Sequence, residues 1–440
     1  MRPIQRTGAA LLCLVSAAAF GSGIPAWAAS LHGVPAATKR APVTVTMWYG
    51  LGGTLGAEFR ALVNTFNRTH PDIHVVVDYE GTYTGGGPLQ QKLLAAIEAH
   101  STPDLVQLEV HSMPVFASTG ALQPLTAFIR HSSVDKPGNF LYGMLASTTY
   151  KGVTYGLPFN RSIPIMFYNK TLFAKAGISA PPTTWAQVAQ DAKRLTHGSG
   201  KTKIYGFTPV DQWWFWEVYT WESGSHIMNP SLTKCEFATP AAARIFQETI
   251  NLVRQGDAVV QSGADGWGLT TASFYNGEVA MSEDSSASIG TVRANVGHKF
   301  QWGVMMMPEG PAGREVPPGG ANIVMMAGLP KATQQAAWTF MQWLTAPSQT
   351  MKWSEETGYL PVQKSVVSSP AYRAYLKTNP QMQVVLDEVK YQHAPPQSPH
   401  YLGIYGYAQD AMSSMYFNNV PALTALKTAQ QEANALLTGS

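Results

Sequence analysis

The segment between residues 43 and 109 alternates between strand and helix patterns, which limits the folds that the chain can adopt. Three short apolar runs have the length and composition of strands. Two segments with apolar residues at helical spacing separate them. A β-α-β-α-β order predicts an α/β fold with a parallel sheet and right-handed crossovers. The predicted strands are 43–48, 73–77 and 105–108, and the helices contain Phe59–Phe66 and Leu89–Ala99.

Residues 1–28 have the pattern of a secretory signal peptide. Arg2 and Arg6 precede an apolar stretch from Ala9 to Phe20, and Ala26-Trp27-Ala28 fits a signal-peptidase cleavage site. The apolar stretch is shorter than the roughly 20 residues that span a bilayer, which disfavours a membrane anchor. We therefore expect export to the periplasm.

The cysteines leave the exported chain without an internal disulfide. Cys13 lies in the segment to be removed, and Leu11-Leu12 stands where a lipoprotein signal has a small residue, so we expect no lipid anchor. Cys235 then remains alone, and stability must come from core burial. A mature chain of about 410 residues predicts two or more domains.

The composition disfavours nucleic acid and anionic membranes as partners. The formal net charge of +3 falls to +1 when Arg2 and Arg6 are removed, and no run of Lys or Arg occurs. Charged residues make up only 13%, whereas the chain has 12 Trp and 18 Tyr. Most aromatic side chains belong to cores. Flat aromatic faces also line carbohydrate and polyol sites.

No cofactor or metal site is predicted. Glycines at 50, 52, 53 and 56 imitate a dinucleotide fingerprint, but Leu55 occupies the position of its third glycine. The chain has no H-E-x-x-H, C-x-x-C, P-loop lysine or G-x-S-x-G motif, and its His residues are scattered. Ligands of open parallel sheets bind beyond the carboxyl ends of the strands, which here are followed by Tyr49-Gly50, Tyr79–Tyr83 and Glu109.

The rest of the chain continues the alternation of strands and helices. We expect a strand at 163–168, and helices at 171–177, from 184 with Thr183 or Thr184 as the N-cap, and at 240–255, 331–345 and 422–437.

Several short motifs, in order along nearly the whole mature chain, resemble those of the extracellular solute-binding proteins of ABC importers for sugars and glycerol phosphates. The resemblance is strongest to the members that bind glycerol-3-phosphate. Each motif is weak alone, and the ordered set is specific. The motifs are Trp48 with Gly56, Phe66-Asn67 and Pro71; Pro158-Phe159-Asn160-Arg161-Ser162-Ile163-Pro164 with Tyr168-Asn169-Lys170; Phe274-Tyr275-Asn276-Gly277 with Ala280-Met281; Pro318-Gly319-Gly320-Ala321; and Thr357-Gly358-Tyr359-Leu360-Pro361.

This resemblance implies two lobes, several crossings between them, a ligand in the cleft and hinge closure. Crossings are expected near Pro158, Ser285 and Ala327. The expected N-terminal lobe is 41–158 plus 286–328, and the C-terminal lobe is 159–285 plus 329–440. It further implies a monomer that binds a polyol, sugar or glycerophosphodiester and docks on the membrane permease subunits of an importer.

The family's ligand contacts, carried over by position, have chemistry that suits a polyol. Glu109 offers acceptors for two hydroxyl groups, the tyrosines combine a flat face with a hydroxyl, and the serines donate to oxygen atoms. A Gly-Gly pair is usually only a turn, and a single serine usually caps local backbone. The implied contacts are Tyr83, Glu109, Ser162, Ser285, Gly320 and Tyr359.

Two further features concern the identity of the ligand. The glycerol-3-phosphate-binding members pair the phosphate with an arginine near the C-terminus, where this chain has Tyr401. Arg161 and His400 are possible substitutes. The family also implies a ligand-site Trp in the segment that contains Trp213 and Trp214, although packing is the commoner role of a Trp. We hypothesise a glycerophosphodiester or a sugar rather than free glycerol-3-phosphate.

A secreted hydrolase is the alternative function. Glycoside hydrolysis uses paired carboxylates, which Glu109 with Glu283 or Asp284 could supply. These segments match a family of binding proteins, so we expect binding without catalysis, and no catalytic residue.

Overall fold

A computed structural model describes residues 41–263 and 265–439. The expected signal peptide, including Cys13, lies outside these residues. Within them, no helix combines the length and the apolar character that a membrane crossing requires.

The first sheet contains the three predicted strands. They pair in parallel, with Val43 opposite Ile73 and Met47 opposite Leu105. Two later strands, β11 and β6, complete the sheet antiparallel to β3 and to each other, so the sheet is mixed and not purely parallel. The strand order is β2 (Ile73–Tyr79), β1 (Val43–Tyr49), β3 (Leu105–Glu109), β11 (Gly319–Met325) and β6 (Gly156–Ser162).

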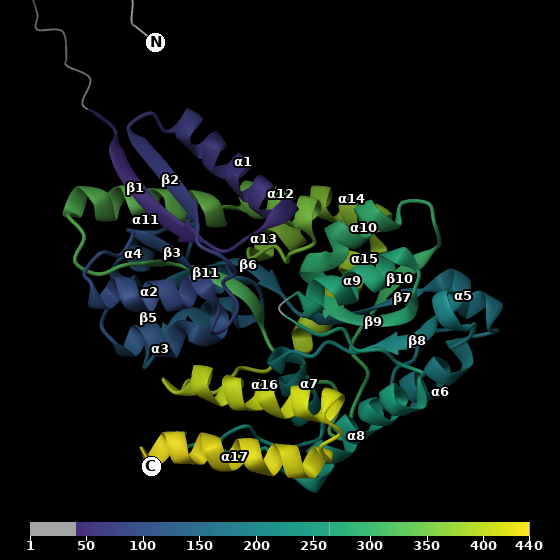
Figure 1. Ribbon diagram of the computed structural model, residues 1–440. Coiled ribbons are helices and arrows are strands. Elements are labelled where there is room, and N and C mark those ends of the chain that lie inside the picture. Colours follow the sequence, from purple (N-terminus) through teal and green to yellow (C-terminus); the bar gives the residue numbers. More distant parts are fainter. Residues whose placement is uncertain (1–40, 264, 440) are drawn as a thin grey trace, which may run out of the picture. The chain divides into compact units, whose positions relative to one another are not determined.

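Helices cover both faces of this sheet (Figure 1). On one face, α1 (Gly53–Thr69) buries Phe59, Leu62, Val63 and Phe66, the four residues with the predicted helical spacing. Helix α11 (Lys331–Thr345) packs on the same core. On the other face, α2 (Pro88–Glu98) and α3 (Met113–Ser118) pack against side chains of β3.

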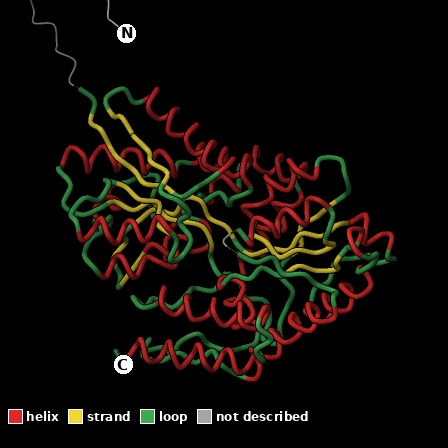
Figure 2. The backbone as a smooth tube through the Cα atoms, viewed as in Figure 1, coloured by secondary structure: helices red, strands yellow, loops and turns green. Residues whose placement is uncertain are grey.

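The second sheet has four strands, one fewer than the first, and is separate from it (Figure 2). Strand β7 pairs antiparallel with β10 and with β9, and β8 runs parallel to β9. The order is β10 (Trp302–Met305), β7 (Pro164–Asn169), β9 (Val279–Ser285) and β8 (Tyr205–Thr208). A two-stranded hairpin of β4 (Thr149–Tyr150) and β5 (Val153–Thr154) stands apart.

Among the remaining helices, α5, α6, α8 and α17 lie at the predicted positions, and the others were not predicted. Thr184 caps α6 by accepting a hydrogen bond from the Gln187 N–H, and α8 has the predicted bounds. The remaining helices are α4 (Thr126–His131), α5 (Lys170–Lys175), α6 (Trp185–Leu195), α7 (Trp213–Glu222), α8 (Pro240–Gln255), α9 (Gly266–Asn276), α10 (Ile289–Val296), α12 (Pro347–Thr357), α13 (Lys364–Val367), α14 (Pro370–Thr378), α15 (Pro380–Glu388), α16 (Tyr401–Phe417) and α17 (Ala422–Thr438).

Cys235 is buried, and burial raises the pKa of its thiol to about 12.

The chain passes between the sheets at places that differ in part from those expected. The step from β6 to β7 is at Ile163, five residues beyond the expected Pro158. After Ser285 the chain stays with the second sheet, because β10 pairs with β7, and it returns only through 306–318. After Ala327, α11 packs against β1 and β6 of the first sheet. Strand β10 was expected in the N-terminal lobe but belongs to the second sheet, and α11 was expected in the C-terminal lobe but packs on the first. The other lobe boundaries stay a prediction.

Gly320 allows a close approach between β11 and β6. Its φ of +87° lies in the left-handed region, and a Cβ atom would overlap the carbonyl oxygen of Asn160. The ladder shifts register immediately afterwards, between Ala321 and Asn322. A glycine is therefore required for backbone geometry as well as for space.

We predict that Gly320→Ala lowers the free energy of unfolding more than Gly328→Ala does. Gly328 also has a positive φ of +81°, but nothing lies within 4 Å of its added Cβ. In the control, Gly328→Ala, the free energy of unfolding should fall by about 1–2 kcal/mol, because alanine disfavours a positive φ. Gly320→Ala should cost about 1–3 kcal/mol beyond that, because the strands must move apart. Equal losses in urea unfolding would show that the close approach is unimportant.

Candidate binding site

One cavity, of about 190 Å³, brings together most of the predicted site residues. Its wall combines the ends of β3 and β6 and the start of β11 with the start of α7, the start of α9 and the end of β9. Eight of the nine predicted residues line it: Tyr83, Glu109, Ser162, Trp213, Trp214, Ser285, Gly320 and Tyr359.

Tyr401 is the exception, because it lies behind the cavity wall and not on it. Its side chain is fully buried, and its hydroxyl donates to Glu217 Oε1 at 2.6 Å. The Tyr401 ring packs against Tyr405, which stacks on Trp213 at 3.7 Å between ring centroids. The prediction of a direct contact at Tyr401 is therefore not supported, since α16 places the ring one layer too deep.

The Glu109 carboxylate faces the cavity with most of its acceptor capacity already used. Oε1 accepts from the His111 backbone N–H at 2.9 Å and lies 2.6 Å from His111 Nδ1. Oε2 accepts from the Ser112 hydroxyl at 2.9 Å. Because a carboxylate has about four acceptor positions, one is left for a ligand hydroxyl, where two were expected.

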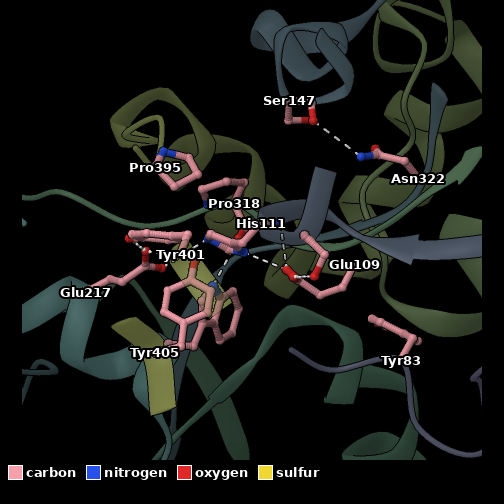
Figure 3. Close-up of polar contacts among 12 residues, drawn as sticks. Tyr83, Glu109, His111, Ser147, Glu217, Pro318, Asn322, Pro395, Tyr401 and Tyr405 are labelled. Atoms are coloured by element: carbon pink, nitrogen blue, oxygen red, sulfur yellow. Dashed lines mark hydrogen bonds and ion pairs between the residues drawn. The ribbon is translucent and has the colours of Figure 1, made fainter. Parts of the chain in front are cut away.

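His111 is a buried cation held between two carboxylates (Figure 3). Its Nδ1 contacts Glu109, and its Nε2 lies 3.1 Å from Glu217 Oε2, an ion pair without hydrogen-bond alignment. Burial alone would lower the pKa of the imidazole. The charges of Glu217 and Glu109 outweigh burial and raise the pKa to about 9.

A chain of buried hydrogen bonds leads from the first sheet to the two tyrosines of the cavity. Gln107 accepts from the Gly50 N–H and donates to Asn160 Oδ1 at 2.8 Å. Asn160 in turn donates to the Tyr83 hydroxyl at 3.0 Å, which lies 3.1 Å from the Tyr359 hydroxyl. Burial raises the pKa of both tyrosines, so they remain neutral donors and acceptors.

Two indoles of the Trp-rich segment, Trp213 and Trp214, form part of the cavity wall. Gln212 caps α7 by accepting from the Trp214 N–H at 2.8 Å. The Trp214 indole N–H donates to the Pro318 carbonyl at 3.0 Å, which fixes the ring beside Gly319. Trp216 packs on Phe237 away from the cavity.

Sequence reasoning missed Trp267 and its support. Trp267 is the second residue of α9 and lies beside Trp214, with ring centroids 5.7 Å apart. Its indole N–H donates to Asp284, which also accepts from the Ser285 N–H and the Ser288 hydroxyl. Lining residues absent from the prediction are Thr84, Gln212, Trp267, Ala287, Ser288 and Gly319.

None of the lining residues is a Lys, Arg or His. Arg161 donates instead to the Ser147 hydroxyl at 2.7 Å and to Asn322 Oδ1 at 3.3 Å, and burial lowers its pKa to about 10. His400 is exposed at the start of α16. Neither residue substitutes for an arginine at the cavity.

We predict that Asp284→Ala lowers the free energy of unfolding by at least about 2 kcal/mol, because it removes the acceptor of four donors, and the two that are buried would each cost about 1–3 kcal/mol when left unpaired. Thr271→Val is the matched control, since it removes one of the donors to Asp284, together with a longer hydrogen bond of 3.2 Å to the Trp267 carbonyl. It should cost about 1 kcal/mol. Equal losses in urea unfolding would contradict the role given to Asp284.

Comparisons with known proteins identify relatives in sequence and in fold. The sn-glycerol-3-phosphate-binding periplasmic protein UgpB of Pectobacterium atrosepticum is 28% identical over 361 residues, which is 78% of this chain and 79% of that protein. The acarbose-binding GacH receptor of Streptomyces glaucescens and UgpB of Mycobacterium tuberculosis in complex with glycerophosphocholine each have a TM-score of 0.79 at 24% identity. The match covers 90% of this chain in both cases, and 99% and 98% of the respective proteins.

These neighbours share the two-lobed binding-protein fold. The model of the family described as "Bacterial extracellular solute-binding protein" matches residues 61–383. The chain belongs to the bacterial extracellular solute-binding proteins, which are the solute-binding components of ABC importers.

Proposed function

We propose that this chain captures a sugar or a glycerophosphodiester in the cavity and delivers it to the permease subunits of an ABC importer. The observation that carries the proposal is the chemistry of the wall. It combines one carboxylate, several hydroxyls and three indole-bearing residues, with no cationic side chain. Such a wall suits hydroxyl groups and C–H surfaces of a solute that is not strongly anionic.

The same wall argues against free glycerol-3-phosphate as the main ligand. A phosphate dianion would sit near the Glu109 carboxylate without a guanidinium or ammonium partner. Each missing hydrogen bond to a charged donor removes about 1.5–3 kcal/mol of binding free energy. In a phosphodiester the phosphate has a single negative charge, and in a neutral sugar it is absent, so both avoid most of this penalty.

Capture by closure is the mechanism that we propose. Glu109 and Gly320 approach the cavity from the first sheet, and Trp214 and Ser285 approach it from the side of the second. A ligand that contacts both sides gains affinity only when they are together, and so shifts the population toward the closed form. The closed protein would then dock on the permease.

Location and assembly complete the proposal. The curated relatives are named periplasmic proteins, and we propose that this chain is exported to the same compartment and acts as a monomer. Its near-neutral charge gives no reason to expect a nucleic-acid partner.

A hydrolase would need a second carboxylate at the cavity, and the candidates face elsewhere. Glu283 accepts from the Val210 N–H and from the Tyr219 hydroxyl, and both oxygens of Asp284 hold buried donors. Neither residue lines the cavity. The alternative function therefore lacks the paired carboxylates on which it rests.

Titration calorimetry tests the ligand class. Glycerophosphocholine or a sugar such as maltose should bind with micromolar or tighter affinity, whereas free glycerol-3-phosphate should bind at least tenfold more weakly than the better of the two. Micromolar binding of glycerol-3-phosphate in preference to both would contradict the proposal.

Substitution of cavity residues tests the position of the site. We expect Glu109→Ala and Tyr359→Ala each to weaken binding at least tenfold, because each removes a polar contact from the wall. Glu98→Ala and Tyr142→Ala are matched controls at exposed positions and should bind as the unmodified protein does. Unchanged affinity in both cavity variants would place the site elsewhere.

A further inference from the structure

His111 reaches from the first sheet into side chains of two helices on the other side of the cavity. It lies in a turn (Val110–Ser112) directly after β3, and its side chain is 1% exposed. Its ring lies edge-on to Trp213 of α7 at 5.1 Å and to Tyr405 of α16 at 5.4 Å, and parallel to Tyr401 at 6.2 Å. Three aromatic rings thus surround one imidazole.

The two nitrogens of this ring contact carboxylates from different parts of the fold. Glu109 ends β3, whereas Glu217 belongs to α7 and is fully buried. A ring that satisfies both carboxylates carries a proton on each nitrogen. Removing the imidazole would leave two buried negative charges without their shared counter-ion, which is strongly unfavourable.

Glu217 is also held from its far side. Its Oε1 accepts from the Tyr401 hydroxyl at 2.6 Å and from the Tyr405 hydroxyl at 3.4 Å. A continuous polar path therefore runs from the cavity-lining carboxylate through His111 and Glu217 to α16 (Figure 3).

We propose that His111 is a positioning residue that couples solute binding to closure, by orienting Glu109 from one side and pairing with Glu217 from the other. The inference rests on the proposed function, because Glu109 is taken to contact the solute. The backbone N–H and Nδ1–H of His111 both occupy Oε1, which turns Oε2 toward Ser112 and the remaining ligand position. The contact with Glu217 forms only while the two sides are together, so its free energy favours the closed arrangement.

A histidine that merely fills the core would predict a different response. Loss of such a residue lowers stability but leaves the affinity of the folded protein and its pH dependence unchanged. A coupling role requires that Glu217, which does not line the cavity, also affects affinity.

The direction of the pH dependence follows from the groups that face the ring. These are Glu109, Glu217, Tyr401 and Tyr405. The two carboxylates raise the pKa of His111 from 6.5 to about 9 in the folded protein. The stabilisation is thus complete below pH 6.5 and is lost as the pH rises through 9. The pKa values of both tyrosines are raised, so neither titrates in this window.

The experiment compares His111→Gln and Glu217→Gln with the exposed control His131→Gln, using glycerophosphocholine and maltose as probes. Both test variants should bind the active probe at least tenfold more weakly at pH 7, and the control should not change. Affinity of the unmodified protein should fall between pH 7 and 9.5, and His111→Gln should lose this decline. Unchanged affinity in Glu217→Gln, or a persistent decline in His111→Gln, would overturn the inference.

A measurement without ligand separates failure of the coupling from failure of the proposed function. The NMR titration of His111 in the ligand-free protein should give a pKa above 6.5, because Glu109 stays beside the ring when the two sides are apart. Glu217→Gln should lower this pKa in proportion to the fraction of molecules in which the two sides are together. A value near 6.5 in the unmodified protein would overturn the inference whether or not either probe binds. Glu217→Gln preserves side-chain volume, so it carries the test if His111→Gln does not fold.

Discussion

A carboxylate buried at the end of a strand has to be compensated, and the site is built around that requirement. Glu109 is 4% exposed. It receives two donors from His111 and one from Ser112, and the charge of His111 is balanced in turn by Glu217. An isolated ion there would be destabilising by several kcal/mol. The network therefore keeps an acceptor available at the cavity without leaving a free charge in the interior.

The mixed topology brings the two sides of the cavity together. Only Ile163 separates β6 from β7. Ser162 is therefore the last residue of β6 in the first sheet, and Pro164 already pairs with Ser285 in the second. The return through 306–318 delivers Gly319 and Gly320 to the same place. The absence of a Cβ at Gly319 leaves room for the Trp214 ring, so one wall of the cavity depends on two glycines and one indole.

Sequence patterns predicted what local periodicity and ordered motifs encode. Periodicity predicted the buried face of α1 and the bounds of α8 and α11. The ordered motifs of the family predicted eight residues that line the cavity. Sequence patterns did not predict the antiparallel strand β11, the pairing of the four-residue β10 or the depth of Tyr401. These features depend on contacts between segments that are distant in the sequence. His111 and Trp267 were also missed, because no spacing in the sequence marks either residue as functional.

A crystal structure of the protein grown with saturating glycerophosphocholine or maltose tests the central claim most directly. The account predicts an intact solute in the cavity, with a hydroxyl accepted by Glu109 Oε2 and the solute in contact with an indole and with Tyr359. It also predicts that His111 stays between Glu109 and Glu217. A bound solute elsewhere on the protein, or an empty cavity beside a solute held by other residues, would contradict it.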